Sequence, residues 1–224
     1  MTRMETSRIT VTGRGGIHVV PDVTRVELTV SGIRQEYSDC YELARENNKV
    51  LQRIMQMLGL DEKLPKTIHL DIEKETHTVY DDHGNFDHVS FDGYSLDQKI
   101  KIDLGMDNIL LNRLVQAIGQ QMTNVEISIG YTIRDTREIQ MVILERAVKD
   151  AREKAERMAR AAGCTLGGVV NIDYSWNDIN VYSQAREIHS CQEAAACCEE
   201  SLDITPDDLA ANDTVRVIWE LKQD

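Results

Sequence analysis

The chain has 224 residues, of which 42% are hydrophobic and 28% are charged, and its formal net charge at pH 7 is -13. This length is sufficient for one large domain or two small ones, each with a buried core. The acidic charge excludes nucleic acid as a default partner, because binding to the phosphate backbone needs a basic surface. We also expect no membrane span, because the sequence has no run of about 18 consecutive apolar residues.

The cysteines and the first residues bear on the cellular compartment. The five cysteines are odd in number and follow no extracellular spacing pattern, which favours reduced thiols inside a cell. Residues 1–8 contain no hydrophobic segment of the kind found in a signal peptide. We therefore expect a cytoplasmic protein, or a secreted or periplasmic one if a leader has been removed.

The first predicted element is one long β-strand over residues 9–30. Its apolar residues alternate with polar ones, as in a strand that buries one face. The glycines in residues 13–16 indicate a bend or bulge, and Pro21-Asp22 indicates a turn or an edge-strand break. Phosphate-binding loops are also glycine-rich. However, the Gly-Lys-Ser/Thr ending and a following helix are both missing, so we favour the bend.

An amphipathic helix and a hairpin are predicted next. Ser38 is a suitable N-cap, and apolar residues recur at helical spacing as far as Gly59, which is suited to a C-cap. Residues 67–80 and 89–104 alternate like two antiparallel strands, and the polar turn 81–87 between them contains a Gly-Asn turn signal. These residues therefore predict a helix followed by a long β-hairpin.

Helices and strands continue to alternate through the rest of the chain. The further predicted elements are a short helix over residues 107–119, a strand over 125–133, a long helix over 137–162 and strands over 169–174 and 214–221.

The predicted order is strand, helix, strand, strand, helix, strand, helix, strand, strand. Such an order predicts an α+β fold, with a largely antiparallel sheet packed against three helices. No linker rich in proline, glycine or serine separates the elements, so we expect a single domain over residues 9–222. Within it, residues 177–212 are predicted to form a flexible acidic insertion. This connection is long, and residues 183–213 carry eight acids and one base.

Four segments resemble, in order and spacing, the SIMPL (DUF541) family; they are residues 11–22, 93–102, 145–167 and 215–221. The first holds Val-Thr-Gly-x-Gly and then Pro-Asp, the second begins with Gly-Tyr, and the third contains Ala-x-x-Asp-Ala-x-x-Lys-Ala. The resemblance implies a compact α+β fold. It also implies one of two settings: secreted or periplasmic proteins that assemble into large rings, or a cytosolic adaptor that binds a pelle-like kinase. It implies no catalytic residues for this sequence.

Histidines near the hairpin turn are the first candidate site. His77, His83 and His88 lie among aspartates, and imidazole and carboxylate groups suit zinc or another divalent metal. The segment has no rigid histidine pair at i,i+4 spacing. We therefore favour solvated turn residues and expect no metal and no other cofactor.

Cys191, Cys197 and Cys198 are the second candidate site. They lie in the acidic segment close to His189 and could act as exposed, redox-active thiols. Adjacent cysteines are unsuited to the usual Cys-x-x-Cys zinc geometry, and nothing nearby is basic enough to lower a thiol pKa. We therefore favour a loop with incidental thiols.

The sequence contains no Gly-x-Ser-x-Gly, His-Glu-x-x-His or Rossmann motif. We therefore expect a non-enzymatic protein that acts through self-assembly or protein binding, as a homo-oligomer joined through sheet edges or the hairpin over residues 67–104. The alternative is a metal- or thiol-dependent activity on a small molecule at residues 77–88 or 191–198. A third hypothesis is an adaptor whose loop contacts are switched by oxidation of those thiols.

Overall fold

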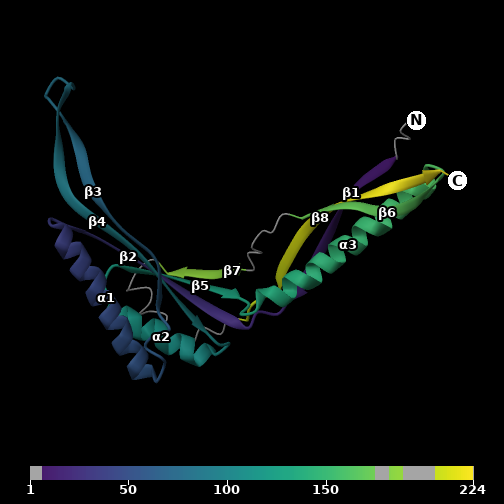
Figure 1. Ribbon diagram of the computed structural model, residues 1–224. Coiled ribbons are helices and arrows are strands. Elements are labelled where there is room, and N and C mark those ends of the chain that lie inside the picture. Colours follow the sequence, from purple (N-terminus) through teal and green to yellow (C-terminus); the bar gives the residue numbers. More distant parts are fainter. Residues whose placement is uncertain (1–6, 175–181, 189–204, 224) are drawn as a thin grey trace. The chain divides into compact units, whose positions relative to one another are not determined.

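The computed structural model describes residues 7–174, 182–188 and 205–223. The elements in chain order are β1 (Arg8–Val19), β2 (Val23–Arg34), α1 (Tyr37–Leu58), β3 (Lys66–Tyr80), β4 (Phe86–Leu104), α2 (Asn108–Gln121), β5 (Val125–Thr132), α3 (Thr136–Ala161), β6 (Cys164–Asp173), β7 (Tyr182–Ile188) and β8 (Leu209–Gln223). They form two compact units. The first unit holds β1, α3, β6 and β8, and the second unit holds the other elements (Figure 1).

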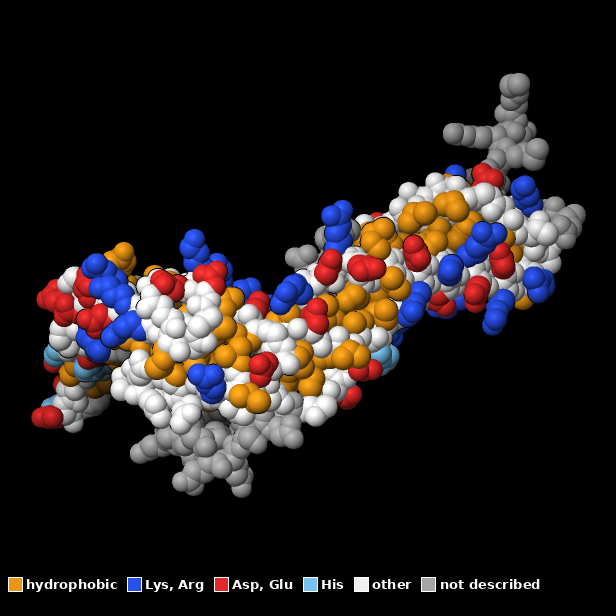
Figure 2. Space-filling view, turned by 90° about the horizontal axis from the view of Figure 1, so that it is seen from below, with side chains coloured by type: hydrophobic (Ala, Val, Ile, Leu, Met, Phe, Trp, Pro, Cys, Tyr) orange, Lys and Arg blue, Asp and Glu red, His pale blue; other side chains and the backbone are white. Residues whose placement is uncertain are grey.

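The first unit is a three-stranded antiparallel sheet with one long helix on it. The strand order is β1-β8-β6, and α3 packs on one face of the sheet. The core between them is formed by Val11, Val215, Val217, Trp219 and the alanines Ala147, Ala151 and Ala155. The solvent side of the unit carries charges of both signs beside a band of hydrophobic side chains (right side of Figure 2).

Glycines of β1 let α3 lie directly on the strand. A Cβ atom at Gly13 would overlap the backbone of Ala147 and Ala151, and one at Gly15 would overlap the carbonyl oxygen of Ile143. β1 pairs with β8 in an unbroken register, so the predicted alternative of a bulge at residues 13–16 is wrong. The glycines are instead required by the close approach of a helix to a strand.

The second unit is a five-stranded sheet in the order β3-β4-β2-β5-β7. α1 and α2 pack on one face of it, and their apolar residues meet those of β2, β4 and β5 in the main core. Asp107 caps α2, because its carboxylate accepts hydrogen bonds from the N–H groups of Ile109 and Leu110 at 2.9 and 3.0 Å. Gly59 ends α1 in the left-handed conformation, with φ 72°.

The predicted α+β class, three helices and antiparallel strands are confirmed. The prediction of one strand over residues 9–30 is wrong, because β1 and β2 belong to different sheets. The predicted break at Pro21-Asp22 is confirmed, since it lies between the two strands. β1 pairs with β8, whereas β2 pairs with β4 and β5. Both strands have alternating apolar residues, and the alternation does not reveal that their partners lie in different parts of the chain.

Two parts of the expected flexible acidic insertion over residues 177–212 are β-strands. β7 occupies Tyr182–Ile188, and β8 already begins at Leu209. Most of the remaining insertion lies outside the described residues. The expected single domain over residues 9–222 contains both compact units. No helix in the described ranges is both long and apolar enough to cross a membrane.

Asp150 of α3 gives the first unit a pH-dependent contribution to stability. Its carboxylate accepts hydrogen bonds from Lys154 Nζ at 2.6 Å and from the backbone N–H of Arg14 at 2.7 Å. These hydrogen bonds, the one from Lys154 first, lower the pKa of Asp150 below its usual 3.8. A carboxyl group with a lower pKa in the folded state stabilises the fold above the unfolded pKa, and this contribution is lost as the pH falls through the folded pKa.

We therefore expect Asp150→Asn to lower the melting temperature near neutral pH, with the difference from wild type vanishing as the pH falls below 3.8. Thermal unfolding followed by circular dichroism over a series of acidic buffers measures both effects. Glu153→Gln is the matched control, since Glu153 is an exposed carboxylate on the same helix. A deficit of Asp150→Asn that persisted unchanged at the acidic end would contradict the assignment.

Candidate functional site

The β3–β4 hairpin extends beyond the strand next to it. β4 pairs with β2 only as far as the pair Arg34–Tyr94. β3 and β4 continue together to the pair Tyr80–Phe86, so the outer part of the hairpin is a ribbon of two strands (Figure 1). Within the described part of the chain, this outer ribbon has no sheet neighbour on either side.

One face of this ribbon is apolar and aromatic. Alternate residues of a strand share a face with their cross-strand partners. The register therefore places the pairs Lys74–Tyr94, Thr76–Phe91, Thr78–Val89 and Tyr80–Phe86 on the same face. The same face of the hairpin is covered by α1 nearer the sheet, because the preceding pair, Ile72–Leu96, packs with Cys40 and Ala44 of α1.

The apolar side chains of this face are exposed. Tyr80 and Phe86 are each 63% exposed, Val89 is 55% exposed and Phe91 is 43% exposed. The chain has two phenylalanines, and both of them are in this group. Phenylalanine is among the residues most often buried, so two of them exposed on a ribbon that no described residue covers make this face a candidate interaction surface.

The base of the ribbon holds its aromatic rings in a fixed arrangement. The ring of Tyr94 lies 5.8 Å from that of Tyr37, the first residue of α1, and 5.4 Å from that of Phe91, both in edge-to-face geometry. Lys74 Nζ lies 5.5 Å from the centre of the Phe91 ring. We call the surface formed by Tyr37, Lys74, Tyr80, Phe86, Val89, Phe91 and Tyr94 the aromatic face.

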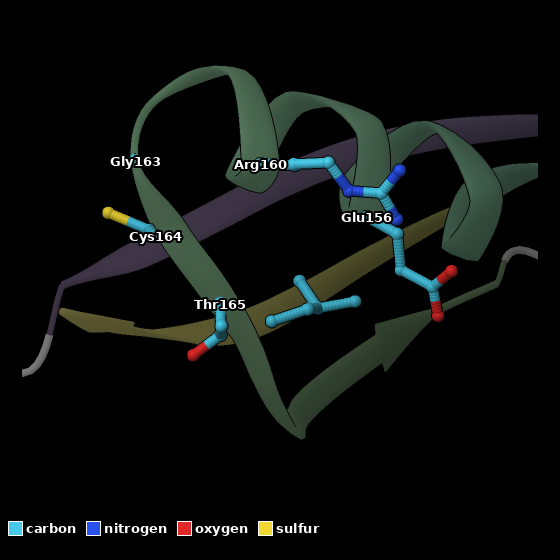
Figure 3. Close-up of a pocket in the computed structure, with 6 residues that line it drawn as sticks. Glu156, Arg160, Gly163, Cys164 and Thr165 are labelled. Carbon is cyan, nitrogen blue, oxygen red and sulfur yellow. The ribbon is translucent and has the colours of Figure 1, made fainter. Parts of the chain in front are cut away.

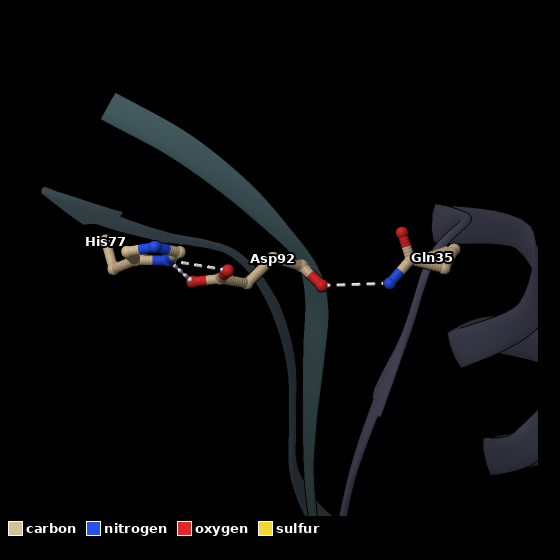
Figure 4. Close-up of polar contacts among 3 residues, drawn as sticks. All are labelled: Gln35, His77 and Asp92. Carbon is tan, nitrogen blue, oxygen red and sulfur yellow. Dashed lines mark hydrogen bonds and ion pairs between the residues drawn. The ribbon is translucent and has the colours of Figure 1, made fainter. Parts of the chain in front are cut away.

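The opposite face of the ribbon is mostly polar and contains His77, His88 and the half-buried Val79. His77 Nδ1 lies 2.7 Å from Asp92 Oδ1, and the backbone oxygen of Asp92 accepts a hydrogen bond from Gln35 Nε2 at 3.0 Å (Figure 4). Asp92 is an extra residue of β4, opposite the step from Glu75 to Thr76. These contacts fix the bulge and connect the ribbon to the segment before α1.

The predicted histidine cluster does not converge on a common point. His77 contacts Asp92, whereas His88 Nδ1 contacts Asp87 at 2.9 Å. His83 lies in the turn, where its backbone N–H donates to Asp81. In the described part of the chain, no three His, Cys, Asp or Glu side chains are grouped so that they could hold a metal ion.

Asp81 organises the tip of the hairpin. Its carboxylate accepts hydrogen bonds from the backbone N–H groups of His83 at 2.9 Å and Asn85 at 2.8 Å. The hydrogen bond from Asn85 is the main reason that the pKa of Asp81 is lowered from its usual 3.8. The tip is thus an ordered turn that keeps Tyr80 opposite Phe86.

The predicted thiol site lies outside the described residues, since Cys191, Cys197 and Cys198 fall in 189–204. Of the other cysteines, Cys40 is buried and its thiol donates to the backbone oxygen of Tyr94 at 3.2 Å. Cys164 is half-buried beside a cavity of about 240 Å³. Figure 3 shows its sulfur pointing away from the guanidinium of Arg160, so this cavity brings no cation to the thiol.

Sequence reasoning identified the hairpin but missed its aromatic face. The signal is present in the sequence, because Phe86 at the end of the predicted turn and Val89 and Phe91 in the second predicted strand follow one another among polar residues. The two extra residues at Asp87 and Asp92 break the simple alternation of β4. A strict period of two therefore assigns these apolar residues to different faces, whereas the bulges bring them to the same one.

The sequence of this chain matches the model of a protein family over nearly its whole length. Residues 9–219 match the SIMPL model, described as a protein of unknown function (DUF541), and this match spans both units. The chain therefore belongs to the SIMPL family, and the resemblance found in its sequence is confirmed.

One similar protein is the 26 kDa periplasmic immunogenic protein of Brucella abortus (strain S19). The two are 26% identical over 225 residues, which cover 96% of this chain and 85% of that protein. The name of that relative places that protein in the periplasm.

Proposed function

We propose that this protein is non-enzymatic and acts by self-assembly, with the aromatic face of the β3–β4 hairpin as the contact between copies. The observation that carries the proposal is the exposure of both phenylalanines of the chain on an uncovered ribbon. Aromatic side chains supply most of the binding energy at many protein interfaces. A surface that buries them against a partner recovers their hydrophobic free energy.

The charge of the aromatic face favours a second copy of this chain as the partner. The face has one charged residue, Lys74, in a chain that carries 38 acidic residues. Two copies could join here without bringing carboxylates together, whereas most other surfaces of a chain with net charge -13 repel one another. A self-complementary apolar patch is what a two-fold symmetric contact requires.

The non-enzymatic part of the proposal is supported by the absence of a recognised catalytic motif in the sequence. The metal alternative has no support in the hairpin, because its histidines contact separate carboxylates. We also propose an exported location, as named for the Brucella relative. Fractionation of the source organism tests it, and recovery of the protein in the cytoplasm alone would refute it.

Light scattering coupled to size exclusion tests the assembly. At micromolar concentration, we expect a wild-type mass above the monomer mass of 25.4 kDa. The double variant Phe86→Thr/Phe91→Thr retains β-propensity and should reduce the mass. Losing two aromatic contacts of about 2 kcal/mol each raises the dissociation constant by roughly a thousandfold.

The matched control changes the polar face of the same hairpin. Glu73→Thr/His88→Thr introduces the same residue type at two exposed positions of β3 and β4, and it should leave the mass unchanged. A monomeric wild-type protein at micromolar concentration would refute the proposal. So would a folded aromatic-face variant, with wild-type circular dichroism, that kept the wild-type mass.

A further inference from the structure

The sheet of the first unit has one face buried under α3 and a second face whose side chains are exposed. The residues of β1 and β8 that are buried on the α3 side are Val11, Gly13, Gly15, Val215, Val217 and Trp219. Successive side chains of a strand point to opposite faces of a sheet. The residues between those on the α3 side therefore form the second face, which we call the outer face.

The outer face is polar and rich in threonine and arginine. Its central residues are Arg8, Thr10, Thr12 and Arg14 of β1 and Asn212, Thr214, Arg216, Ile218, Glu220 and Lys222 of β8. All of them are exposed except Ile218 and Glu220, which are half-buried. β6 adds Asn171 and Asp173, which the register pairs with Ile218 and Arg216. Ile218 is thus an isolated apolar side chain in a hydrophilic surface.

The outer face has a charge opposite in sign to that of the whole chain. Its bases are Arg8, Arg14, Arg216 and Lys222, and its acids are Glu220 and Asp173, so basic groups are in excess. The chain as a whole has a net charge of -13. An acidic ligand is therefore attracted to this face and repelled by most of the remaining surface.

Two arginines and two threonines form a compact group at the centre of the outer face. The register pairs Thr12 with Arg216 and Arg14 with Thr214. The arginines are thus diagonal neighbours on adjacent strands, with Cβ atoms about 7 Å apart, and the threonines lie on the other diagonal. Guanidinium groups bind carboxylates through pairs of N–H donors, and a hydroxyl both donates and accepts hydrogen bonds. The group therefore has the donors that a carboxylate ligand with neighbouring hydroxyls needs.

The guanidinium groups of Arg14 and Arg216 are available to a ligand. Arg14 Nη2 donates to Asn212 Oδ1 at 3.1 Å, which uses one of five N–H donors and holds the side chain on the face. Among the described residues, neither arginine belongs to an ion pair, although Asp173 is the cross-strand neighbour of Arg216. In the second unit, by contrast, Arg25 is held by Asp103 at 2.7 and 3.0 Å.

The chemistry of the outer face favours a polysaccharide over other acidic partners. Protein interfaces have an apolar and aromatic core, and single-stranded nucleic acids stack their bases on aromatic side chains. The central residues of the outer face include no aromatic side chain. A polysaccharide presents hydroxyls along its whole length, and threonine and asparagine side chains are suitable hydrogen-bond partners for them.

We propose that the outer face of the first unit binds an acidic polysaccharide. Carboxylates of its uronic acid residues contact Arg14 and Arg216, and its hydroxyls contact Thr12, Thr214 and Asn212. This inference goes beyond the proposed self-assembly, because it concerns a different kind of ligand and a face in the other unit from the aromatic face.

Fluorescence anisotropy of a labelled oligogalacturonate at low salt tests the proposal. Titration with wild-type protein should give saturable binding. The methyl-esterified oligomer keeps its hydroxyls but has no carboxylate charge, and it should not bind in the same concentration range. Arg14→Gln/Arg216→Gln should raise the dissociation constant by about a hundredfold, because a charged hydrogen bond lost at each arginine weakens binding about tenfold.

Two further double variants separate this site from general charge attraction. Arg157→Gln/Arg160→Gln removes the same charge from exposed positions of α3, and it should leave the dissociation constant within about twofold of wild type. Thr12→Val/Thr214→Val keeps the β-branched shape but loses both hydroxyls, so it should weaken binding about tenfold. Circular dichroism should give the wild-type spectrum for all of these variants, since the changed side chains are exposed.

The absence of saturable binding to wild-type protein would overturn the proposal. Equal effects of the two arginine variants, or wild-type affinity of Thr12→Val/Thr214→Val, would overturn it as well, because charge alone would then explain the attraction. Vesicles containing phosphatidylglycerol and a polyglutamate peptide are titrated in parallel. Tighter binding of either one, dependent on Arg14 and Arg216, would replace the polysaccharide with a lipid surface or an acidic protein segment.

Discussion

Gly15→Val is expected to lower the free energy of unfolding of the first unit by more than about 3 kcal/mol. Its Cβ would overlap the carbonyl oxygen of Ile143 and lie 2.8 Å from the backbone nitrogen of Ala147. Both atoms belong to the backbone of α3, so no side-chain rotation relieves the overlap. The helix would have to move away from β1, and the buried contacts of Ala147 and Ile143 would be lost with it.

Urea unfolding followed by circular dichroism measures this loss. Gly16→Val is the matched control, because a Cβ at Gly16 would meet its nearest atom, the backbone oxygen of Ala211, at an ordinary 3.6 Å. The two variants add the same side chain at neighbouring positions of one strand. Equal stabilities of the two variants would show that close packing of α3 on β1 is not what requires glycine.

Gly93→Ala is expected to cost at least about 2 kcal/mol, because it combines backbone strain with a steric overlap. Gly93 has φ 139°, a conformation that L-residues rarely adopt. A Cβ there would also lie 2.5 Å from the backbone oxygen of Arg34, at the point where β2 ends and the ribbon continues. Thermal unfolding measures the total cost.

Two other glycines separate the components of this cost. Gly84 also has a positive φ, 79°, but a Cβ there would meet no atom within 4 Å. Gly84→Ala should therefore lower the free energy of unfolding by about 1 kcal/mol through backbone strain alone. Gly105→Ala has neither feature and should be close to wild type. If Gly93→Ala were as stable as Gly84→Ala, the overlap with the backbone oxygen of Arg34 would contribute nothing to the loss of stability.

Local elements of this fold could be predicted closely from sequence. The helix predicted over residues 137–162 is α3 (Thr136–Ala161), and the one predicted over residues 107–119 is α2 (Asn108–Gln121). Helical periodicity and caps such as Asp107 lie within a few residues of one another in the chain, so the sequence displays them directly. The hairpin was predictable for the same reason, because its strands adjoin a polar turn.

The candidate site was predicted only in part. The sequence predicts the hairpin, but the candidate site predicted within it is formed by His77, His83 and His88. In the structure these three residues contact separate partners. Exposure of Phe86 and Phe91 could not be predicted, because a covered strand and an uncovered one have the same alternating pattern. Whether a helix covers a given stretch depends on where α1 lies, and α1 covers the hairpin at Leu96 but leaves Phe91 exposed.

The sequence by itself determined the family, the fold class, the three helices and the long hairpin, because their signals are periodicities and turns within short stretches of chain. Only the tertiary structure decided that residues 9–30 form two strands of different sheets, that α3 packs against Gly13 and Gly15, and that no described residue covers the aromatic face. Each of these depends on contacts between residues far apart in sequence, such as β1 with β8. A local pattern fixes which side chains share a face, and it leaves open what packs against that face.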